Sequence, residues 1–183
     1  MNEALARERF EHALEHQRPV FGEFFLARFL GLSVSYGDQT CRVDLPTAEY
    51  MYNPQGSLHG GVIAIAMDVS MGHLNHRFLR AGITLEMKTQ YLRPVTGPCW
   101  CEARFTKTGR RIVFSESKLF DEEDRLCAVA TATWMLLPEA GGPSDSPGPA
   151  EAVATATESA AGTEPKAAPE PKATVPEGGT AMT

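Results

Sequence analysis

The chain has 183 residues, and 43% of them are hydrophobic, which fits one globular domain with a core of its own. A formal net charge of −6 argues against nucleic acid as a partner, and no apolar run reaches the roughly 20 residues that a membrane helix needs. The charged N-terminus lacks the hydrophobic segment of a signal peptide, and the four cysteines follow neither disulfide nor metal-site spacing. We therefore expect a cytoplasmic protein with buried thiols.

The N-terminal part of the chain predicts two helices and a β-hairpin. Residues 1–17 are charged and helix-like, and a second helical stretch over residues 20–31 ends at a glycine. The candidate apolar face of the first helix consists of Leu5, Phe10, Ala13 and Leu14. Short alternating runs at 32–37 and 40–46 flank an Asp-Gln pair, which is typical of a hairpin.

The segment SLHGGVIAIAMDVSMG, residues 57–72, is small and apolar almost throughout. It predicts a helix that starts near His59 or Gly60, runs to about Asn75 and is buried on most sides. Strands with period-two alternation are expected after it, at residues 83–94, 99–109, 111–122 and 125–137. Because the helix has hardly any polar face, the sheet has to wrap around it. The order of elements therefore predicts an α+β fold, with a curved antiparallel sheet around one long central helix.

The composition changes at Pro138. The residues that follow contain many prolines but no aromatic residue, leucine or isoleucine, so they cannot bury enough apolar surface to fold. We expect a folded domain at residues 1–137, with its N-terminal helices within 1–30, and a disordered Ala/Pro/Glu-rich tail at 138–183. The tail holds seven acidic residues against two lysines, so the folded domain is close to neutral.

Asp68 is the single acid within the apolar helix. Burying a carboxylate without a partner costs several kcal/mol, so such a residue has either a partner or a task. The start of the same helix offers backbone N–H groups and two glycines, Gly60 and Gly61, that let a substrate approach the backbone. Asn53 and His59 add polar side chains next to it. A carboxylate and donors for an oxyanion are groups that hydrolysis at a carbonyl carbon requires.

Asp68 lies two helical turns beyond Gly60, roughly 12 Å along the axis at 1.5 Å per residue. It therefore cannot easily reach the N-terminus of its own helix. A second copy whose helix lies antiparallel could bring its Asp68 opposite Gly60 and His59, which the sequence alone leaves as a geometric possibility. Burial would raise the pKa of Asp68 and the facing helix dipole would lower it, and the sequence does not decide between them.

The segment NPQGSLHGGVIAIAMDVSMG, followed by GITLEMKTQYLRP, resembles the hotdog-fold acyl-CoA thioesterases of the phenylacetate-degradation (PaaI-like) type. The resemblance covers about residues 21–137 and leaves the tail outside. It implies a hotdog fold, in which a curved antiparallel sheet wraps one long helix. It also implies a homodimer with active sites at the subunit interface, and a dimer of dimers as the expected assembly.

The resemblance further implies roles for individual residues. Asp68 would be the nucleophile or the general base that activates water, and Thr84 would hold the attacking water or the acid. The Gly60 N–H, helped by Asn53, would polarise the thioester carbonyl, and His59 would support that loop or the leaving thiolate. Asp68 and Thr84 would come from one subunit, and the other three residues from its partner.

The expected partner is an acyl-CoA substrate, with aryl, medium-chain and long-chain acyl groups all open. Its CoA end is assigned to Gly61, Arg93, Lys107, Arg110 and Arg111. No cofactor and no metal are expected, because His73 and His76 at the helix end lack further ligands. The expected function is hydrolysis of the thioester to the free acid and CoA. The alternatives are a non-catalytic acyl-CoA-binding or sensing protein of the same fold and an acyl-CoA hydratase or dehydratase.

Overall fold

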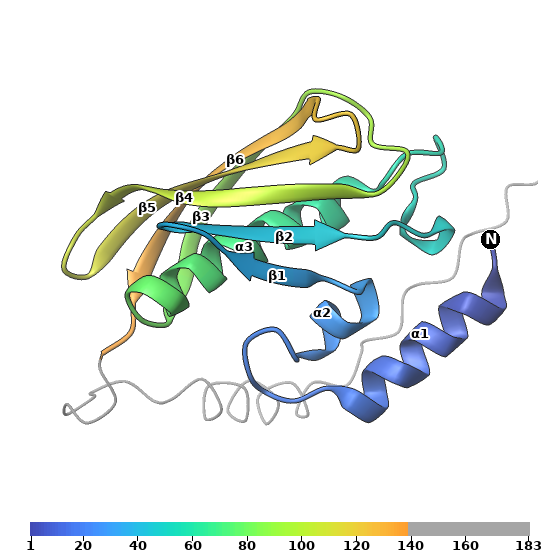
Figure 1. Cartoon of the computed structure of the whole chain (residues 1–183), viewed down its shortest axis with the longest axis horizontal. Helices are drawn as coiled ribbons and strands as arrows, with labels where there is room; N and C mark the ends of the chain where they lie inside the picture. The colour runs from blue at the N-terminus through green and yellow to red at the C-terminus, as the bar shows by residue number, and fades with distance from the viewer. Residues whose placement is uncertain (139–183) are drawn as a thin grey trace, which may run out of the picture. The chain divides into compact units, whose positions relative to one another are not determined.

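The computed structural model describes residues 1–138, so the prediction of a disordered tail lies outside the described residues (Figure 1). In chain order the elements are α1 (Glu3–His16), α2 (Phe25–Leu30), β1 (Ser33–Tyr36), β2 (Thr40–Leu45), the 3-10 helix η1 (Glu49–Met51), α3 (Gly60–Phe78), β3 (Gly82–Tyr91), β4 (Cys99–Thr108), β5 (Ile112–Asp121) and β6 (Leu126–Leu136).

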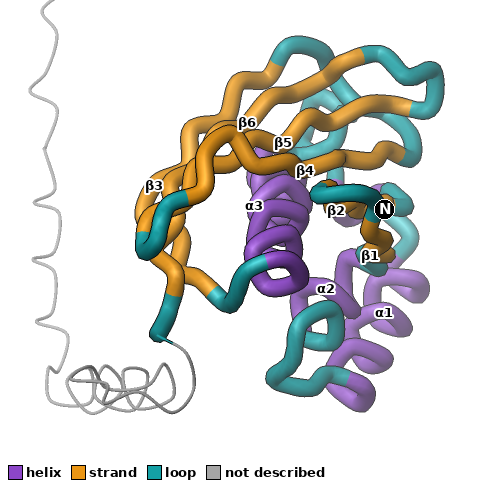
Figure 2. The backbone as a smooth tube through the Cα atoms, turned by 60° about the vertical axis from the view of Figure 1, so that its left-hand side comes forward, coloured by secondary structure: helices purple, strands orange, loops and turns teal. Residues whose placement is uncertain are grey.

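The six strands form one sheet in the order β1-β2-β4-β5-β6-β3, and every neighbouring pair is antiparallel. Figure 2 shows α3 within the curve of this sheet, with β3 on one side of the helix and β1 and β2 on the other. Strands β2 to β6 all contact α3. The predicted α+β architecture, a curved antiparallel sheet around one long helix, is confirmed.

Helix α3 forms the centre of the core because its sequence leaves almost no polar face for water. It extends to Phe78, three residues beyond the predicted end at Asn75. Its inward side chains meet those of the alternating strands, which point to the concave face of the sheet. The largest fully buried apolar side chains are Leu45, Met67, Met71, Leu74, Leu119, Val43, Val95 and Val113.

The predicted apolar face of α1 is partly wrong. Ala13 is fully buried, but Phe10 and Leu14 are 47% and 54% exposed. The reason is that α1 packs mainly against the short helix α2, and Phe10 meets Phe25 only edge-on. The helix starts where expected, because the Asn2 side chain accepts a hydrogen bond from the Leu5 N–H at 3.1 Å and caps it.

All four cysteines are free and buried, as predicted. Burial raises the pKa of Cys41 and Cys99 to about 12 and that of Cys101 to about 11. These thiols are therefore protonated at neutral pH and unreactive as nucleophiles. In the described part of the chain, no helix combines the length and apolar character needed to cross a membrane.

His73 is a buried residue near the end of α3. Its Nδ1 lies 2.8 Å from the Tyr36 hydroxyl, and the Phe21 ring meets it edge-on. Burial, with a smaller effect of the neighbouring His76, lowers the pKa of His73 below its ordinary value. The unfolded chain thus binds a proton at this residue more readily than the folded chain does.

Acid should therefore destabilise the fold through His73. A lowered folded-state pKa means that stability is fully present above the ordinary histidine pKa of about 6.5 and is lost as the pH falls below it. We expect the free energy of unfolding, measured by urea titration, to decrease between pH 7 and pH 5. The decrease should be smaller in His73→Gln than in the wild-type protein. In His12→Gln, a control on exposed α1, it should equal the wild-type decrease. Equal decreases in all three proteins would contradict the assignment.

Candidate active site

The loop before α3 is organised by Asn53. Its Oδ1 accepts hydrogen bonds from the N–H groups of Gln55 and Ser57, at 3.0 and 3.2 Å, and its Nδ2 donates to the Ser57 Oγ at 3.0 Å. These bonds close a tight turn in which Gly56 has a φ of +80°, a value that favours glycine. Asn53 therefore fixes the loop that leads into α3.

The start of α3 leaves one backbone donor open. Nδ1 of His59 accepts a hydrogen bond from the Gly61 N–H at 2.9 Å, and the His59 carbonyl accepts from Val62 and Ile63. Among the described residues, the Gly60 N–H has no acceptor. It points out of the positive end of a 19-residue helix. The bond to Nδ1 also means that neutral His59 carries its proton on Nε2, where its exposed ring can donate outward.

Asp68 and Thr84 form a pair between α3 and β3. The Thr84 hydroxyl donates to the Asp68 Oδ1 at 3.0 Å, and both side chains are half-buried. Oδ2 has no hydrogen-bond partner within the described residues. Burial raises the pKa of Asp68 above its ordinary value, and the Thr84 hydrogen bond opposes this effect without cancelling it. The carboxylate is thus held by one oxygen and available at the other.

Tyr91 lies at the other end of β3 and is a residue that the sequence did not single out. Its hydroxyl donates to the Gly60 carbonyl at 2.9 Å. A Cβ on Gly60 would lie 3.2 Å from the Tyr91 Cζ, so the ring occupies the space beside this glycine. Strand β3 therefore runs antiparallel to α3 and contacts it through Thr84 at Asp68 and through Tyr91 at Gly60.

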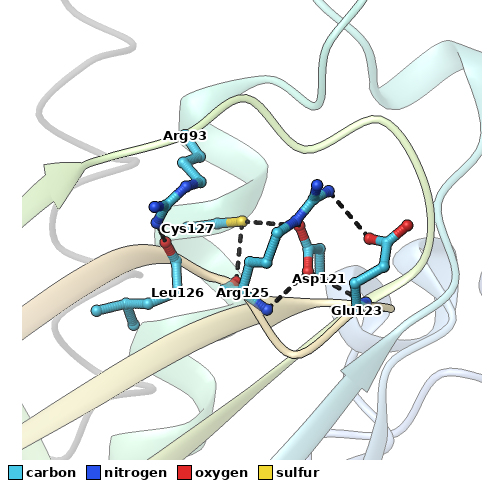
Figure 3. A network of polar contacts seen from close by, with 6 residues as sticks. All are labelled: Arg93, Asp121, Glu123, Arg125, Leu126 and Cys127. Carbon is cyan, nitrogen blue, oxygen red and sulfur yellow. Dashed lines mark hydrogen bonds and ion pairs between the residues drawn. The ribbon is translucent and has the colours of Figure 1, made fainter.

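The predicted CoA-binding residues fall into two groups. Arg93 follows β3, and its Nη1 donates to the Leu126 carbonyl at 2.8 Å beside the Asp121–Arg125 ion pair (Figure 3). Lys107, Arg110 and Arg111 lie at the exposed β4–β5 turn. This turn is at the end of the sheet near Thr84, because Val113 and Thr84 both pair with Trp134. Arg93 lies with Gly60 and Gly61 at the opposite end.

No group of three or more His, Cys, Asp or Glu side chains in residues 1–138 is arranged to hold a metal ion. The two histidines at the end of α3 both contact the Phe21 ring instead. Phe21 meets His73 edge-on and stacks on His76 with the ring centroids 4.0 Å apart.

The site thus combines a carboxylate on a buried helix with an open N–H at the start of that helix, inside a curved antiparallel sheet. A known family has the same sequence pattern. The thioesterase superfamily matches residues 55–128, which cover α3, β3, β4 and β5. The chain belongs to the thioesterase superfamily, and its fold is the hotdog fold, as the resemblance implied.

Relatives with curated descriptions agree with this family. SSO1253 and SSO2140 of Saccharolobus solfataricus, both provisionally named esterases, are 33% identical over 87 residues and 30% identical over 98 residues. The aligned parts cover 46% and 52% of this chain and 58% and 70% of the relatives. The medium/long-chain acyl-CoA thioesterase YigI of Escherichia coli K12 is 34% identical over 105 residues, 45% of this chain and 64% of YigI. The chain thus spans less than two thirds of SSO1253 and of YigI.

Solved structures resemble the described part more completely. The conserved protein PA5202 of Pseudomonas aeruginosa is 34% identical, with a TM-score of 0.58 over 61% of this chain and 93% of that one. A phenylacetic acid degradation-related protein of Ralstonia eutropha is 26% identical, with a TM-score of 0.59 over 70% and 99%. PaaI of E. coli, at 15% identity, shares the fold with a TM-score of 0.61 over 74% and 95%.

Proposed function

We propose that this protein is an acyl-CoA thioesterase, which hydrolyses a CoA thioester to the free acid and CoA. The observation that carries the proposal is the pairing of two features on one apolar helix: the Asp68 carboxylate held by Thr84, and the open N–H of Gly60. Membership of the thioesterase superfamily supports the reaction type. The name of YigI, a medium/long-chain acyl-CoA thioesterase, supports an acyl-CoA as the substrate.

Asp68 acts as the general base in this proposal. Thr84 occupies Oδ1, so Oδ2 is free to accept a proton from water. The raised pKa of Asp68 supports this role, because a base works best with a pKa near the working pH. The water oxygen bonds to the thioester carbon, and the carbonyl π electrons move to the carbonyl oxygen.

The Gly60 N–H stabilises that oxyanion, and the outward Nε2–H of His59 can add a second donor. Asn53 contributes by holding the loop that places both residues. When the tetrahedral intermediate collapses, the carbon–sulfur bond breaks, and the thiolate of CoA takes up the proton from Asp68. The products are the free acid and CoA, and Asp68 is again a carboxylate.

The complete site needs two copies of the chain. Asp68 and Gly60 are roughly 12 Å apart along one helix, too far to act on the same carbonyl group. Strand β3 is an edge of the sheet. Its exposed apolar side chains are Ile83, Leu85 and Tyr91, and Leu92 directly after the strand is exposed as well. If β3 pairs with β3 of a second copy about a two-fold axis perpendicular to the strand, the two α3 helices are antiparallel, which brings Asp68 and Thr84 of one copy toward Gly60 of the other. We propose this homodimer as the minimal active unit, and its pairing into a dimer of dimers stays a prediction.

The CoA end of the substrate fits the same arrangement. In the proposed dimer, the turn with Lys107, Arg110 and Arg111 lies at the Asp68 end of one copy and hence near Gly60 of the other. Three cationic side chains there suit the phosphate groups of CoA. Arg93 and Gly61 would contact the substrate from the other copy.

A CoA-release assay over a panel of aryl-, medium-chain and long-chain acyl-CoAs tests the function. We expect thiol release from at least one class, at a rate proportional to enzyme concentration. Acyl-CoA binding without thiol release from any substrate in the panel would favour the non-catalytic binding protein instead.

Thr84→Val should shift the pH dependence of hydrolysis. The Thr84 hydrogen bond lowers the pKa of Asp68, so its removal raises this pKa further. Because the base must be deprotonated, the acid limb of the kcat/KM profile should move to higher pH. Thr131→Val, on an exposed residue of β6, is the matched control and should leave the limb in place. If the acid limb of Thr84→Val does not move, Asp68 is not the group whose protonation limits activity at low pH.

A further inference from the structure

The peptide group between Gly60 and Gly61 is held at both ends by side chains. Its carbonyl accepts a hydrogen bond from the Tyr91 hydroxyl at 2.9 Å, and its N–H donates to the His59 Nδ1 at 2.9 Å. The Tyr91 ring also closes the space beside Gly60, where an added Cβ would lie 3.2 to 3.4 Å from ring and hydroxyl atoms. Tyr91 comes from β3, so this contact ties the start of α3 to the sheet.

Such a constraint has a physical reason at this position. Two consecutive glycines have more backbone freedom than any other pair of residues. They also begin the helix, where the first N–H groups lack intrahelical partners and the end frays most readily. The peptide group that carries the open Gly60 N–H is the one directly before the clamped peptide group. The His59 carbonyl of that preceding group accepts hydrogen bonds from Val62 and Ile63, so the freedom left to the open N–H is rotation about Gly60, which the clamped peptide group limits.

We propose that Tyr91 is a positioning residue that fixes the direction of the Gly60 N–H toward the reacting carbonyl oxygen. The proposal rests on the proposed function for its catalytic consequence, because it assigns the Gly60 N–H to the oxyanion. Tyr91 itself does not take up or donate a proton in the reaction. Its hydroxyl orients the Gly60–Gly61 peptide group, and its ring excludes other conformations of Gly60.

Tyr91→Phe tests the proposal, with Tyr50→Phe as the matched control. Both substitutions remove one hydroxyl that donates to a backbone carbonyl, since the Tyr50 hydroxyl donates to the Phe29 carbonyl at 3.1 Å, a bond that involves no residue of α3. A catalytic group displaced by about 1 Å loses on the order of 100-fold in rate, and loosening is a smaller change. We expect Tyr91→Phe to lower kcat about 10-fold with KM within twofold of wild type, and Tyr50→Phe to change neither.

A second measurement does not depend on activity. We expect the hydrogen exchange of the Gly61 amide, followed by NMR, to be at least about fivefold faster in Tyr91→Phe than in wild type or Tyr50→Phe. Unchanged Gly61 exchange would overturn the clamp, and so would a kcat loss shared by Tyr50→Phe or a loss confined to KM. If the wild-type protein hydrolyses no thioester, the proposed function fails, whereas faster exchange in Tyr91→Phe alone would still support the clamp.

Discussion

Asp68→Asn should lower kcat for acyl-CoA hydrolysis by about 1,000-fold. General-base catalysis contributes roughly 100- to 10,000-fold, and the amide can still accept the Thr84 hydrogen bond but cannot take a proton from water. The substitution also replaces a half-buried charged group by a neutral one of the same shape. We therefore expect the thermal midpoint of unfolding to stay constant or to rise. Steady-state kinetics and thermal unfolding check both halves of the prediction.

Asp44→Asn is the control for the loss of a carboxylate. Asp44 lies on β2, where its Oδ1 pairs with Arg42 at 2.7 Å, far from Thr84 in the order of strands. This variant should keep kcat within about twofold of wild type, because an exposed ion pair contributes little. If Asp68→Asn keeps a kcat close to that of Asp44→Asn, Asp68 is not the general base.

A mixture of two inactive variants should regain activity if the site is shared between subunits. Asp68→Asn leaves the Gly60 end intact, and Gly60→Ala leaves the Asp68 end intact. The added methyl group of Gly60→Ala lies beside the open N–H and presses on the half-exposed Tyr91 ring, so we expect a loss of about 100-fold in kcat. Random pairing gives half mixed dimers, each with one complete site out of two. The mixture should therefore reach roughly a quarter of the wild-type rate.

The two variants carry different affinity tags, and their co-refolding followed by tandem purification isolates the mixed dimers. Activity that recovers only in the mixed fraction supports a shared site. If mixed dimers are isolated and remain as inactive as their parents, the active site does not combine Asp68 of one subunit with Gly60 of the other. Each parent variant purified and refolded alone is the baseline.

Much of the fold followed from local patterns. The long helix could be predicted because residues 57–72 are apolar on every side, and the strands because their side chains alternate. The exposure of Phe10 and Leu14 could not, since α1 has the composition of a helix with a buried face. What decided it was the small size of α2, the element available to cover that face.

The candidate site divides in the same way. Residues near one another in sequence, such as Asn53, His59 and Gly60, could be assigned to a loop and a helix start directly. The sequence could also indicate Asp68, because a lone acid in an apolar helix is chemically conspicuous. Which N–H of α3 stays open was decided only in three dimensions. There His59 supplies acceptors to Gly61, Val62 and Ile63 and leaves the Gly60 N–H without one.

The limit of prediction from the sequence is clearest at Tyr91. Thr84 and Tyr91 are seven residues apart, so strict alternation would place their side chains on opposite faces of β3. The register between β3 and β6 shifts between Thr84 and Glu86, and the extra residue of this bulge turns Tyr91 to the face of Thr84. The sequence by itself determined the helix, its acid and its glycines. Only the tertiary structure decided that one strand contacts both ends of the site, because a bulge depends on strand pairing and not on local pattern.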